Sequence, residues 1–418
     1  MRTENITLRM AWRNVWRNRH RTLLTLLTIM IGCAMIIFFN SMAKGGHDQM
    51  IEDAVGLNTG HIQIHEKGFW DNQTIDYAFK PSETLITYLS GLPQIEGFSP
   101  RILTGGLLSF RDTTRGVLIQ GIDPRQESRV THIHNKILPG GRFLSETDTT
   151  HAIIGSTLAT HIHASVNDTF AIISQGFDGS IAADRFTVVG IFNSGNPDFD
   201  RELILIPLSQ ADMTFSMMGY VHSMVIRLTD ISLLTDIKTD IVEHTLATRA
   251  GATKLEVLGW DAMMPELIQF IVMDDVGGYI FDFILFMVVA FGILNTVQMS
   301  VFERTREFGI MLSIGTRPRL ITRMILTETA LISLFGIALG LALGYGVSLY
   351  FQIHPIDYSQ FSEEISLWGI STTLYPADTT LKNITVTALT TFALAMVFSI
   401  FPARRAAKLN PVEAIRKL

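Results

Sequence analysis

The sequence predicts a membrane protein with four transmembrane α-helices and a large extracytoplasmic α+β domain inserted between helices one and two. Of its 418 residues, 47% are hydrophobic and only 17% are charged, whereas an ordinary soluble domain is about 25% charged. Four stretches reach the length of about 20 mostly apolar residues that a helix needs to cross a bilayer. The long segment 44–275 contains no such stretch.

The apolar stretches divide the chain into nine segments. The predicted transmembrane helices are 22–43, 276–302, 323–352 and 383–403. The segments before, between and after them are 1–21, 44–275, 303–322, 353–382 and 404–418. The first apolar stretch is about twice as long as the apolar core of a cleaved signal peptide. We therefore expect an uncleaved signal-anchor.

Charge orients these segments. The two ends of the chain and the connection around 303–322, together with the start of the third helix, carry 16 basic and 5 acidic residues. The segment 44–275 carries 16 basic and 29 acidic residues. Because short loops rich in Lys and Arg stay in the cytoplasm, both termini and the 303–322 connection are expected there. The segments 44–275 and 353–382 are expected outside, which predicts a multi-pass protein.

The outer segment 44–275 predicts a mixed domain. Alternating apolar residues predict strands at 61–65, 116–120, 170–173, 186–192, 203–206 and 222–228. Helical periodicity follows Gly155 and surrounds 233–246. The segment is long enough for a hydrophobic core in two lobes.

Both ends of the chain predict short cytoplasmic helices. Residues 1–21 place arginines every four residues beside two tryptophans, a pattern typical of an amphipathic helix on the inner leaflet. In 404–418, Asn410 can cap a helix whose first position is Pro411.

The third predicted span carries Gly336, Gly340 and Gly344 at intervals of four residues. This spacing puts small residues on one face and allows a second helix to approach closely. Packing within one subunit and packing between two subunits both fit the pattern.

Several classes of chemistry are excluded or disfavoured by the residues present. No lysine follows a glycine, so the chain contains no Walker A motif, and G-x-S-x-G and H-E-x-x-H are absent too. The net charge of −6 gives no indication of nucleic-acid binding. Cys33 is the single cysteine, so no internal disulfide can form. We expect a chain without catalytic activity of its own.

No metal site is expected. The histidine pairs in 131–134 and 160–163 are two residues apart, a spacing that shares a face only on a strand, and no cysteine or paired carboxylate completes the ligand set. The alternating Asp198, Asp200 and Glu202 lack the glycine and the distal glutamate of a calcium loop. They are interpreted as an acidic surface loop.

The segment 303–318 has a pattern that suits docking to another protein. It prolongs the second span into the cytoplasm with charges on one side and apolar residues on another, and Gly315 can end the helix in the left-handed conformation. A short, rigid helix with an exposed apolar surface fits a groove in a partner.

These residues carry a family resemblance. The stretch 299–310, MSVFERTREFGI, resembles the coupling segment of FtsX/MacB-type ABC transporter permeases. The stretches 11–18 and 402–414 are similar to the start and the C-terminal signature of that superfamily. In the outer segment, similarity to the lipoprotein-releasing (Lol-type) branch is found at 60–65, 121–124, 189–192 and 206–208.

The resemblance implies a permease subunit in a bacterial inner membrane that pairs with an identical or homologous permease and with two copies of a separate ATPase. No cofactor is implied in this chain, because ATP and Mg²⁺ belong to the ATPase. The residues implied in ATPase coupling are Glu303, Arg304, Arg306, Glu307, Phe308, Gly309, Met311, Leu312, Ile314 and Gly315.

The Lol branch also implies a cargo and its contacts. Lipoproteins would be extracted from the outer leaflet, with their acyl chains between spans one and two. The matching side chains are Met35, Phe38, Phe39, Met42, Phe281, Leu285 and Val288.

One departure concerns the periplasmic lipoprotein carrier. The hairpin that recruits it in the Lol branch is longer and bears a proline, whereas the matching stretch 174–185 is short and has none. Two alternatives follow: a non-recruiting partner permease, or a homodimeric relative with another cargo.

Two further functions stay open from the sequence. One is a MacB-like pump that exports periplasmic substrates, and the other is an FtsX-like regulator of a cell-wall hydrolase that transports nothing. The 232-residue length of 44–275 disfavours the regulator, whose outer segment is usually much smaller.

Overall fold

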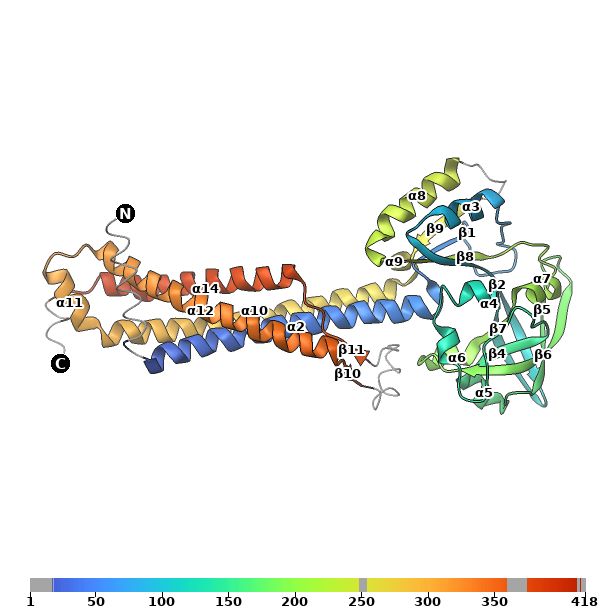
Figure 1. Cartoon of the computed structure of the whole chain (residues 1–418), viewed down its shortest axis with the longest axis horizontal. Helices are drawn as coiled ribbons and strands as arrows, with labels where there is room; N and C mark the ends of the chain where they lie inside the picture. Colours follow the sequence, from blue (N-terminus) through green and yellow to red (C-terminus); the bar gives the residue numbers. More distant parts are fainter. Residues whose placement is uncertain (1–16, 18, 248–253, 359–373, 412–413, 415–418) are drawn as a thin grey trace. The chain divides into compact units, whose positions relative to one another are not determined.

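The structure is a computed structural model, and it describes residues 17, 19–247, 254–358, 374–411 and 414. These residues form two compact units, which we call the helical unit and the β-domain (Figure 1). The helical unit comprises the residues up to Gln49, Phe270–Asp357 and those from Leu374 onward, and the β-domain is essentially Met50–Gln269. Most of the helix predicted in 1–21 lies outside the described residues, and so do six of the 15 residues of the tail helix predicted in 404–418.

Four long helices carry the four apolar stretches. They are α2 (Arg19–Ala54), α10 (Pro265–Glu303), α12 (Pro318–Ile353) and α14 (Leu381–Ala407). Among the described residues these are the helices long and apolar enough to cross a membrane, which confirms the prediction of four long apolar helices. The helices are longer than the predicted spans. α2 continues through 44–54 and α10 begins at 265, and both extensions lie in the segment that the sequence assigned to the α+β domain. The domain boundaries themselves stay predictions.

The glycine stripe of α12 faces α2 within the same chain. A Cβ atom added at Gly340 would lie 2.7 Å from the Cβ of Cys33 and 2.7 Å from the carbonyl oxygen of Met30. At Gly344 it would lie 3.0 Å from the Cα of Ala34. Only glycine lets the two backbones come this close, so in this structure the stripe serves packing inside one subunit.

The remaining elements of the helical unit are short. After α10 comes α11 (Thr305–Ser313), and between α12 and α14 two short strands pair, β10 (Ile356–Asp357) and β11 (Leu374–Tyr375). Next to β11, the amide of Asp378 donates to the carbonyl of Ser41 at 2.8 Å, and Lys44 forms an ion pair with Asp378 at 2.9 Å. These contacts hold the start of the α14 segment against α2.

The β-domain contains a nine-stranded mixed sheet in the order β3-β7-β4-β6-β5-β2-β8-β1-β9. Its strands are β1 (Ile62–Glu66), β2 (Ile95–Phe110), β3 (Thr113–Ile122), β4 (His151–Gly155), β5 (Thr169–Gln175), β6 (Ile181–Phe192), β7 (Leu203–Pro207), β8 (Ser223–Leu228) and β9 (Leu255–Gly259). The six strands predicted from alternation are confirmed. Three were missed: β2, β4 and β9.

The long strand β2 organises this sheet into two parts. Its first half pairs with β8, and its second half pairs with β3 and β5. β3 pairs with β7, β7 with β4, β4 with β6, and β6 with β5, so these five strands and the second half of β2 form a closed ring of six. β8, β1 and β9 extend the sheet from the first half of β2. Both parts contribute to one hydrophobic core, and the two lobes expected from the length of the segment stay a prediction.

Short helices connect and cover these strands. They are η1 (Val55–Thr59, a π-helical turn), α3 (Glu83–Gly91), α4 (Pro124–Glu127), η2 (Ile133–Lys136), α5 (Ser156–Ile162), α6 (Pro197–Glu202), α7 (Leu208–Thr214), η3 (Ile231–Leu233), α8 (Leu234–Ala247) and α9 (Trp260–Met263). The helices predicted after Gly155 and around 233–246 are confirmed as α5 and α8.

The interpretation of 198–202 as an acidic surface loop was wrong in its conformation and for Asp200, whereas Asp198 and Glu202 are exposed as expected. The segment forms α6, capped by Asn196, whose side chain accepts hydrogen bonds from the amides of Asp198 and Phe199. Asp200 is buried and accepts hydrogen bonds from the amide of Ser194 at 3.1 Å and the hydroxyl of Ser156 at 3.0 Å. Alternation of acidic residues suggested that all three are exposed, but the buried carboxylate of Asp200 holds the loop at Ser194 by hydrogen bonds.

We predict that Gly340→Leu lowers the unfolding free energy of the helical unit by about 1–3 kcal/mol, the usual cost of overpacking a filled interface. SDS titration in mixed micelles measures the change. Gly346→Leu is the matched control, since a Cβ at Gly346 would meet nothing within 4 Å, and we expect it to stay within about 0.5 kcal/mol. Equal effects of the two substitutions would contradict the packing of α12 on α2.

Candidate coupling site

The predicted docking segment forms a separate helix rather than a continuation of the second span. α10 ends at Glu303, Arg304 leaves the helical conformation with φ −104° and ψ 15°, and α11 begins at Thr305. At the other end Gly315 has φ +90°, which confirms the predicted left-handed residue. The amide of Thr316 donates to the carbonyl of Met311, and that of Gly315 to Leu312, as in a Schellman motif.

A buried carboxylate fastens α11 to the long helices. Glu328 of α12 accepts a hydrogen bond from the Nη1 of Arg304 at 2.9 Å and one from the Nη2 of Arg21 in α2 at 3.4 Å. The side chains of Glu328 and Arg304 are only 7% and 9% exposed. Isolated charges at this depth would be costly to bury, and each is here compensated by an opposite charge.

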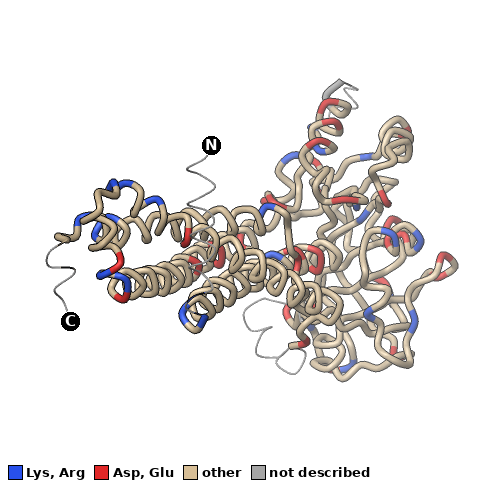
Figure 2. Tube along the Cα trace, turned by 60° about the vertical axis from the view of Figure 1, so that its left-hand side comes forward, with Lys and Arg blue, Asp and Glu red and all other residues tan. Residues whose placement is uncertain are grey.

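The same arginines continue the cluster toward the surface. Arg21 also contacts Glu303 at 3.1 Å, and Arg304 contacts Glu307 at 3.1 Å, while Arg17 pairs with Glu307. Partial burial alone would raise the pKa of Glu307, but hydrogen bonds from Arg17 and Arg304 hold it below its usual value. We call these six residues the Glu328 cluster: Arg17, Arg21, Glu303, Arg304, Glu307 and Glu328. Figure 2 shows basic and acidic residues gathered at the end of the helical unit that carries α11.

Phe308 was predicted to lie on an exposed apolar surface, and this prediction of its exposure was wrong. Its side chain is fully buried in a hydrophobic core with residues such as Ile321 and Ala403. The guanidinium carbon of Arg304 lies 5.0 Å from the centre of its ring. The break at Arg304 turns the apolar face of α11 inward, where α12 and α14 of the same chain cover it.

The outer surface of α11 therefore consists of fewer apolar residues than expected. Ile314 is 77% exposed and Ile310 is 46% exposed, and Arg306 is exposed beside them. Met311 and Leu312 are half-buried, and Gly309 is buried. Ile310 was missed from the sequence, although its spacing of four residues from Ile314 puts both on one helical face.

The second predicted set lies along the contact between α2 and α10. The rings of Phe39 and Phe281 meet edge to face with centres 4.8 Å apart, and Asn40 donates to Asp282 at 2.9 Å. Further along, a Cβ at Gly32 would lie 2.1 Å from a methyl carbon of Val289, so the two helices approach closely.

The predicted cargo residues differ in exposure along this contact. The exposed ones are Met35, Phe39, Phe281 and Val288, and the half-buried ones are Phe38, Met42 and Leu285. The ring of Phe38 is also 5.4 Å from that of Phe351 in α12. The structure thus brings Phe39 and Phe281 together on neighbouring helices, and the contact of this set with a cargo stays a prediction.

The histidines of the β-domain have structural environments. His132 and His134 lie at η2, while His161 is in α5 and His163 caps it in the left-handed conformation. Burial lowers the pKa of His222 to about 4, so its neutral ring accepts from the amide of Leu103 and donates to a carbonyl. Within the described ranges no group of three or more potential ligands could hold a metal ion.

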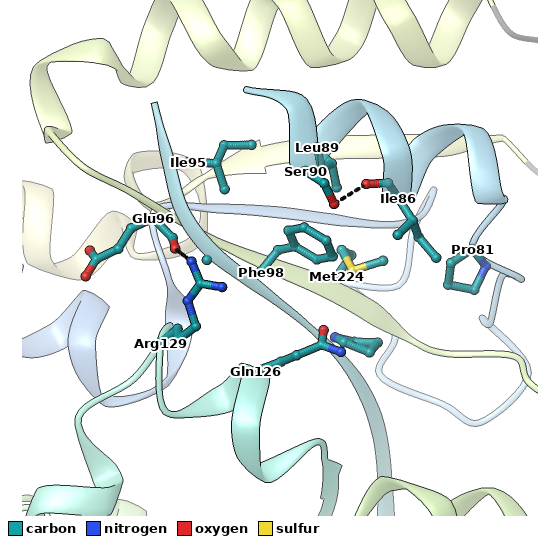
Figure 3. Close-up of a pocket in the computed structure, with 12 residues that line it drawn as sticks. Pro81, Ile86, Leu89, Ser90, Ile95, Glu96, Phe98, Gln126, Arg129 and Met224 are labelled. Carbon is teal, nitrogen blue, oxygen red and sulfur yellow. Dashed lines mark hydrogen bonds between the residues drawn. The ribbon is translucent and has the colours of Figure 1, made fainter. Parts of the chain in front are cut away.

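The β-domain also contains a cavity of about 350 Å³ between α3, β2 and α4 (Figure 3). Its apolar wall is formed by residues that include Leu89, Phe98 and Met224. Of the polar residues there, Ser90 donates to the carbonyl of Ile86, and Arg129 donates to that of Glu96. Both of these side chains thus form hydrogen bonds to backbone carbonyls of the β-domain itself.

Removing the two arginines that bind Glu328 should have a non-additive effect. Arg21→Met or Arg304→Met leaves Glu328 one partner, and we expect each to cost about 1–2 kcal/mol of unfolding free energy. The double variant leaves a buried, unpaired carboxylate, so it should cost more than the sum by at least about 1 kcal/mol.

The measurement is SDS titration of the four proteins, with Arg319→Met on exposed α12 surface as the control. Additivity of the two substitutions within about 0.5 kcal/mol would show that the arginines do not share a carboxylate.

Comparison with known proteins identifies the family. The model of the FtsX-like permease C-terminal domain matches residues 279–411, and that of the MacB-like periplasmic core domain matches residues 22–244. The latter covers more than half of the chain.

The relatives agree with these matches. The chain is 24% identical to the macrolide export ATP-binding/permease protein MacB of Hahella chejuensis, over 98% of this chain and 60% of that protein. It thus spans about 60% of the length of that relative. It is 22% identical to the lipoprotein-releasing system transmembrane protein LolC of Neisseria meningitidis, over 94% of both chains. The periplasmic region of MacB from Actinobacillus actinomycetemcomitans aligns with a TM-score of 0.37 and 16% identity, covering 52% of this chain and 97% of that one.

The four apolar helices, the two family matches and the MacB and LolC relatives agree with the resemblance carried by 299–310. The chain belongs to the FtsX/MacB-type permease superfamily.

Proposed function

We propose that this chain is the permease subunit of an ABC transporter that extracts lipoproteins from the outer leaflet of the inner membrane for transfer to the outer membrane. A separate ATPase, in two copies, supplies the energy and holds the ATP and Mg²⁺. A second permease, identical or homologous, completes the membrane part. The observation that carries the transport proposal is the Glu328 cluster, which joins a short surface helix to three long ones.

The coupling step follows from this geometry. Ile310, Ile314 and Arg306 offer α11 as a small docking surface with an apolar centre and a charged side. An apolar helix face seats well in a groove of a partner. Because Phe308 and Glu328 fasten α11 to the other helices, a push on α11 displaces them with it rather than bending a loop.

The exposed and half-buried side chains along α2 and α10 supply the proposed acyl-chain contacts. Phe39 and Phe281, with Met35 and Val288 beside them, form an apolar strip accessible from outside the helix pair. Exposing an acyl chain to water costs about 0.8 kcal/mol for each methylene group, so an apolar strip that shields the chain while the cargo leaves the bilayer suits a lipid-anchored cargo. Likeness to LolC over 94% of both chains supports the same choice.

The distribution of charge supports the proposed location. In a bacterial inner membrane, the basic ends of the chain and α11 would face the cytoplasm, and the β-domain would face the periplasm. The match of residues 22–244 to a MacB-like periplasmic core domain agrees with this orientation.

The hairpin between β5 and β6 bears on the carrier. Its turn is closed by a hydrogen bond from the amide of Gly176 to the carbonyl of Ser180 at 2.8 Å, and the side chain of Asp178 accepts from the amide of Ser180. This tight turn supports a permease that leaves carrier recruitment to its partner permease.

A second candidate function is export of periplasmic substrates in the manner of MacB. The match to the MacB-like core domain and the likeness to MacB over 98% of this chain favour it specifically. Both candidates use the same coupling through α11 and differ in cargo. An FtsX-like regulator is disfavoured by the size of the β-domain.

If α11 docks the ATPase, Ile314→Asp should reduce the amount of ATPase that copurifies with the chain at least tenfold, because it puts a charge at the centre of the apolar surface. Ile181→Asp, which changes an 83% exposed isoleucine in the β-domain, is the control. An unchanged ATPase yield in the Ile314 variant would overturn the docking assignment.

If lipoproteins are the cargo, depleting the chain should leave outer-membrane lipoproteins in the inner membrane, as measured by sucrose-gradient fractionation. Restoring the unaltered chain should restore their sorting, whereas the Ile314→Asp variant should not. If outer-membrane lipoproteins reach the outer membrane normally during depletion, lipoprotein extraction is contradicted and the export of periplasmic substrates becomes the favoured function.

A further inference from the structure

Strand β2 is paired differently along its two halves. Its residues 101–110 pair with β3, which ends at Ile122 opposite Arg101. Because α4 begins two residues later, β3 does not continue beside residues 95–100. Among the described strands, 95–100 pair with β8 alone. An unpaired strand edge presents backbone N–H and C=O groups to which another extended chain can bind.

The cavity between α3, β2 and α4 opens onto this edge (Figure 3). Four successive residues of the strand line it: Ile95, Glu96, Gly97 and Phe98. Because successive side chains of a strand point to opposite faces, a cavity that meets four residues in a row faces the edge of the strand. A second cavity of about 770 Å³ shares four lining residues with the first: Pro81, Ile86, Pro100 and Gln126. The two cavities therefore form one groove, which we call the β2-edge groove.

The two walls of the β2-edge groove differ in chemistry. Figure 3 shows Ile86 and Leu89 of α3 on one side of the strand, and Gln126 and Arg129 on the other. Leu89 belongs to the hydrophobic core of the β-domain together with Met224, which also lines the groove. A strand added here would direct alternate side chains to the two walls. Its side chains are thus expected to alternate between apolar and polar.

The carboxylates along the groove already have partners. Glu96 forms an ion pair with Arg227 at 3.1 Å. Asp123 caps α4 by accepting from amides of its first turn, and Asp212 accepts from the amide of Gly219 at 2.7 Å. Because these carboxylates are engaged within the β-domain, they leave little negative charge to attract a basic ligand.

The basic groups along the groove keep free donors. Arg129 donates through Nη2 to the carbonyl of Glu96, and its Nε and Nη1 bind no acceptor among the residues that the structure describes. Lys80 also has no acceptor within the described part of the chain. Arg125 is 82% exposed and 4.0 Å from Glu146, so this pair is weak. Carboxylates of a ligand can accept charge-assisted hydrogen bonds from these groups.

We propose that the β2-edge groove binds an extended polypeptide of another protein as an added strand on residues 95–100. Its apolar side chains face α3 and its acidic side chains face α4. The unpaired edge takes about six residues, a strand of about 20 Å. Backbone hydrogen bonds to the edge supply affinity, and the alternating side chains supply specificity. This inference goes beyond the proposed function and holds for either cargo, since the groove lies within the β-domain.

The test uses the full-length chain in lipid nanodiscs and a fluorescein-labelled hexapeptide that alternates valine and glutamate. Fluorescence anisotropy measures its binding, and hydrogen–deuterium exchange locates it on the chain. Two matched peptides are controls for the ligand. One alternates valine and lysine, and the other keeps valine and glutamate on a backbone methylated at every second nitrogen, which removes the donors that pair with a strand edge.

Two variants change the walls, and a third is their control. Arg129→Met removes the free donors on the α4 side, and Ile86→Asp puts a charge on the apolar α3 side, where Ile86 is 39% exposed and folding is at little risk. Arg111→Met is the control, because Arg111 is 66% exposed in the turn between β2 and β3 and does not line the groove.

We expect saturable binding of the valine–glutamate peptide and slower exchange at 95–100 when it is bound. Arg129→Met and Ile86→Asp should each weaken binding at least fivefold, whereas Arg111→Met should stay within twofold. Both control peptides should bind at least tenfold more weakly than the valine–glutamate peptide.

Three outcomes would overturn the proposal. The first is no saturable binding at sub-millimolar peptide, and the second is equal binding of the methylated peptide, which does not need the strand edge. The third is binding that both wall variants leave unchanged or that protects amides other than those of 95–100. None of these measurements involves the ATPase or a lipoprotein, so their result is independent of the proposed function.

Discussion

The helical unit depends on one carboxylate. Glu328 is buried among three helices, so it must be neutralised where it lies, and Arg304 and Arg21 are the groups that do this. Arg304 reaches it from the point at which the chain leaves the helical conformation between α10 and α11. The same break accompanies the burial of Phe308 and the exposure of Ile314. In the proposed function, a helix fixed in this way passes its displacement on to the spans.

Close packing holds α2 where charged groups do not. Glycines of α12 meet it on one side, and Gly32 lets α10 approach on another. Apolar packing and the Glu328 cluster thus fix the long helices of the helical unit to one another.

Much of this could be predicted from sequence where the pattern is local. The four apolar helices, six strands and the αL residue Gly315 follow from periodicity and residue type. Strand β2 was missed because Gly97, Pro100 and Gly105 are typical of turns, yet its partners β3, β5 and β8 on both halves keep it extended.

The coupling segment was located correctly in the chain, but its inner and outer faces were not. A break at Arg304 and the burial of Phe308 depend on α12 and α14, which lie far along the chain. The ion pairs of Glu328 with Arg21 and Arg304 left no signal at all, since no motif links these three residues.

The most direct test of the account is native mass spectrometry of the chain purified in mild detergent from its own cells. The account predicts an assembly of two permease chains and two ATPase subunits, with a lipoprotein or a second, homologous permease in the same particles. Recovery of the chain without any ATPase across several detergents would remove the energy source, and with it the role of α11 and of the Glu328 cluster in transport.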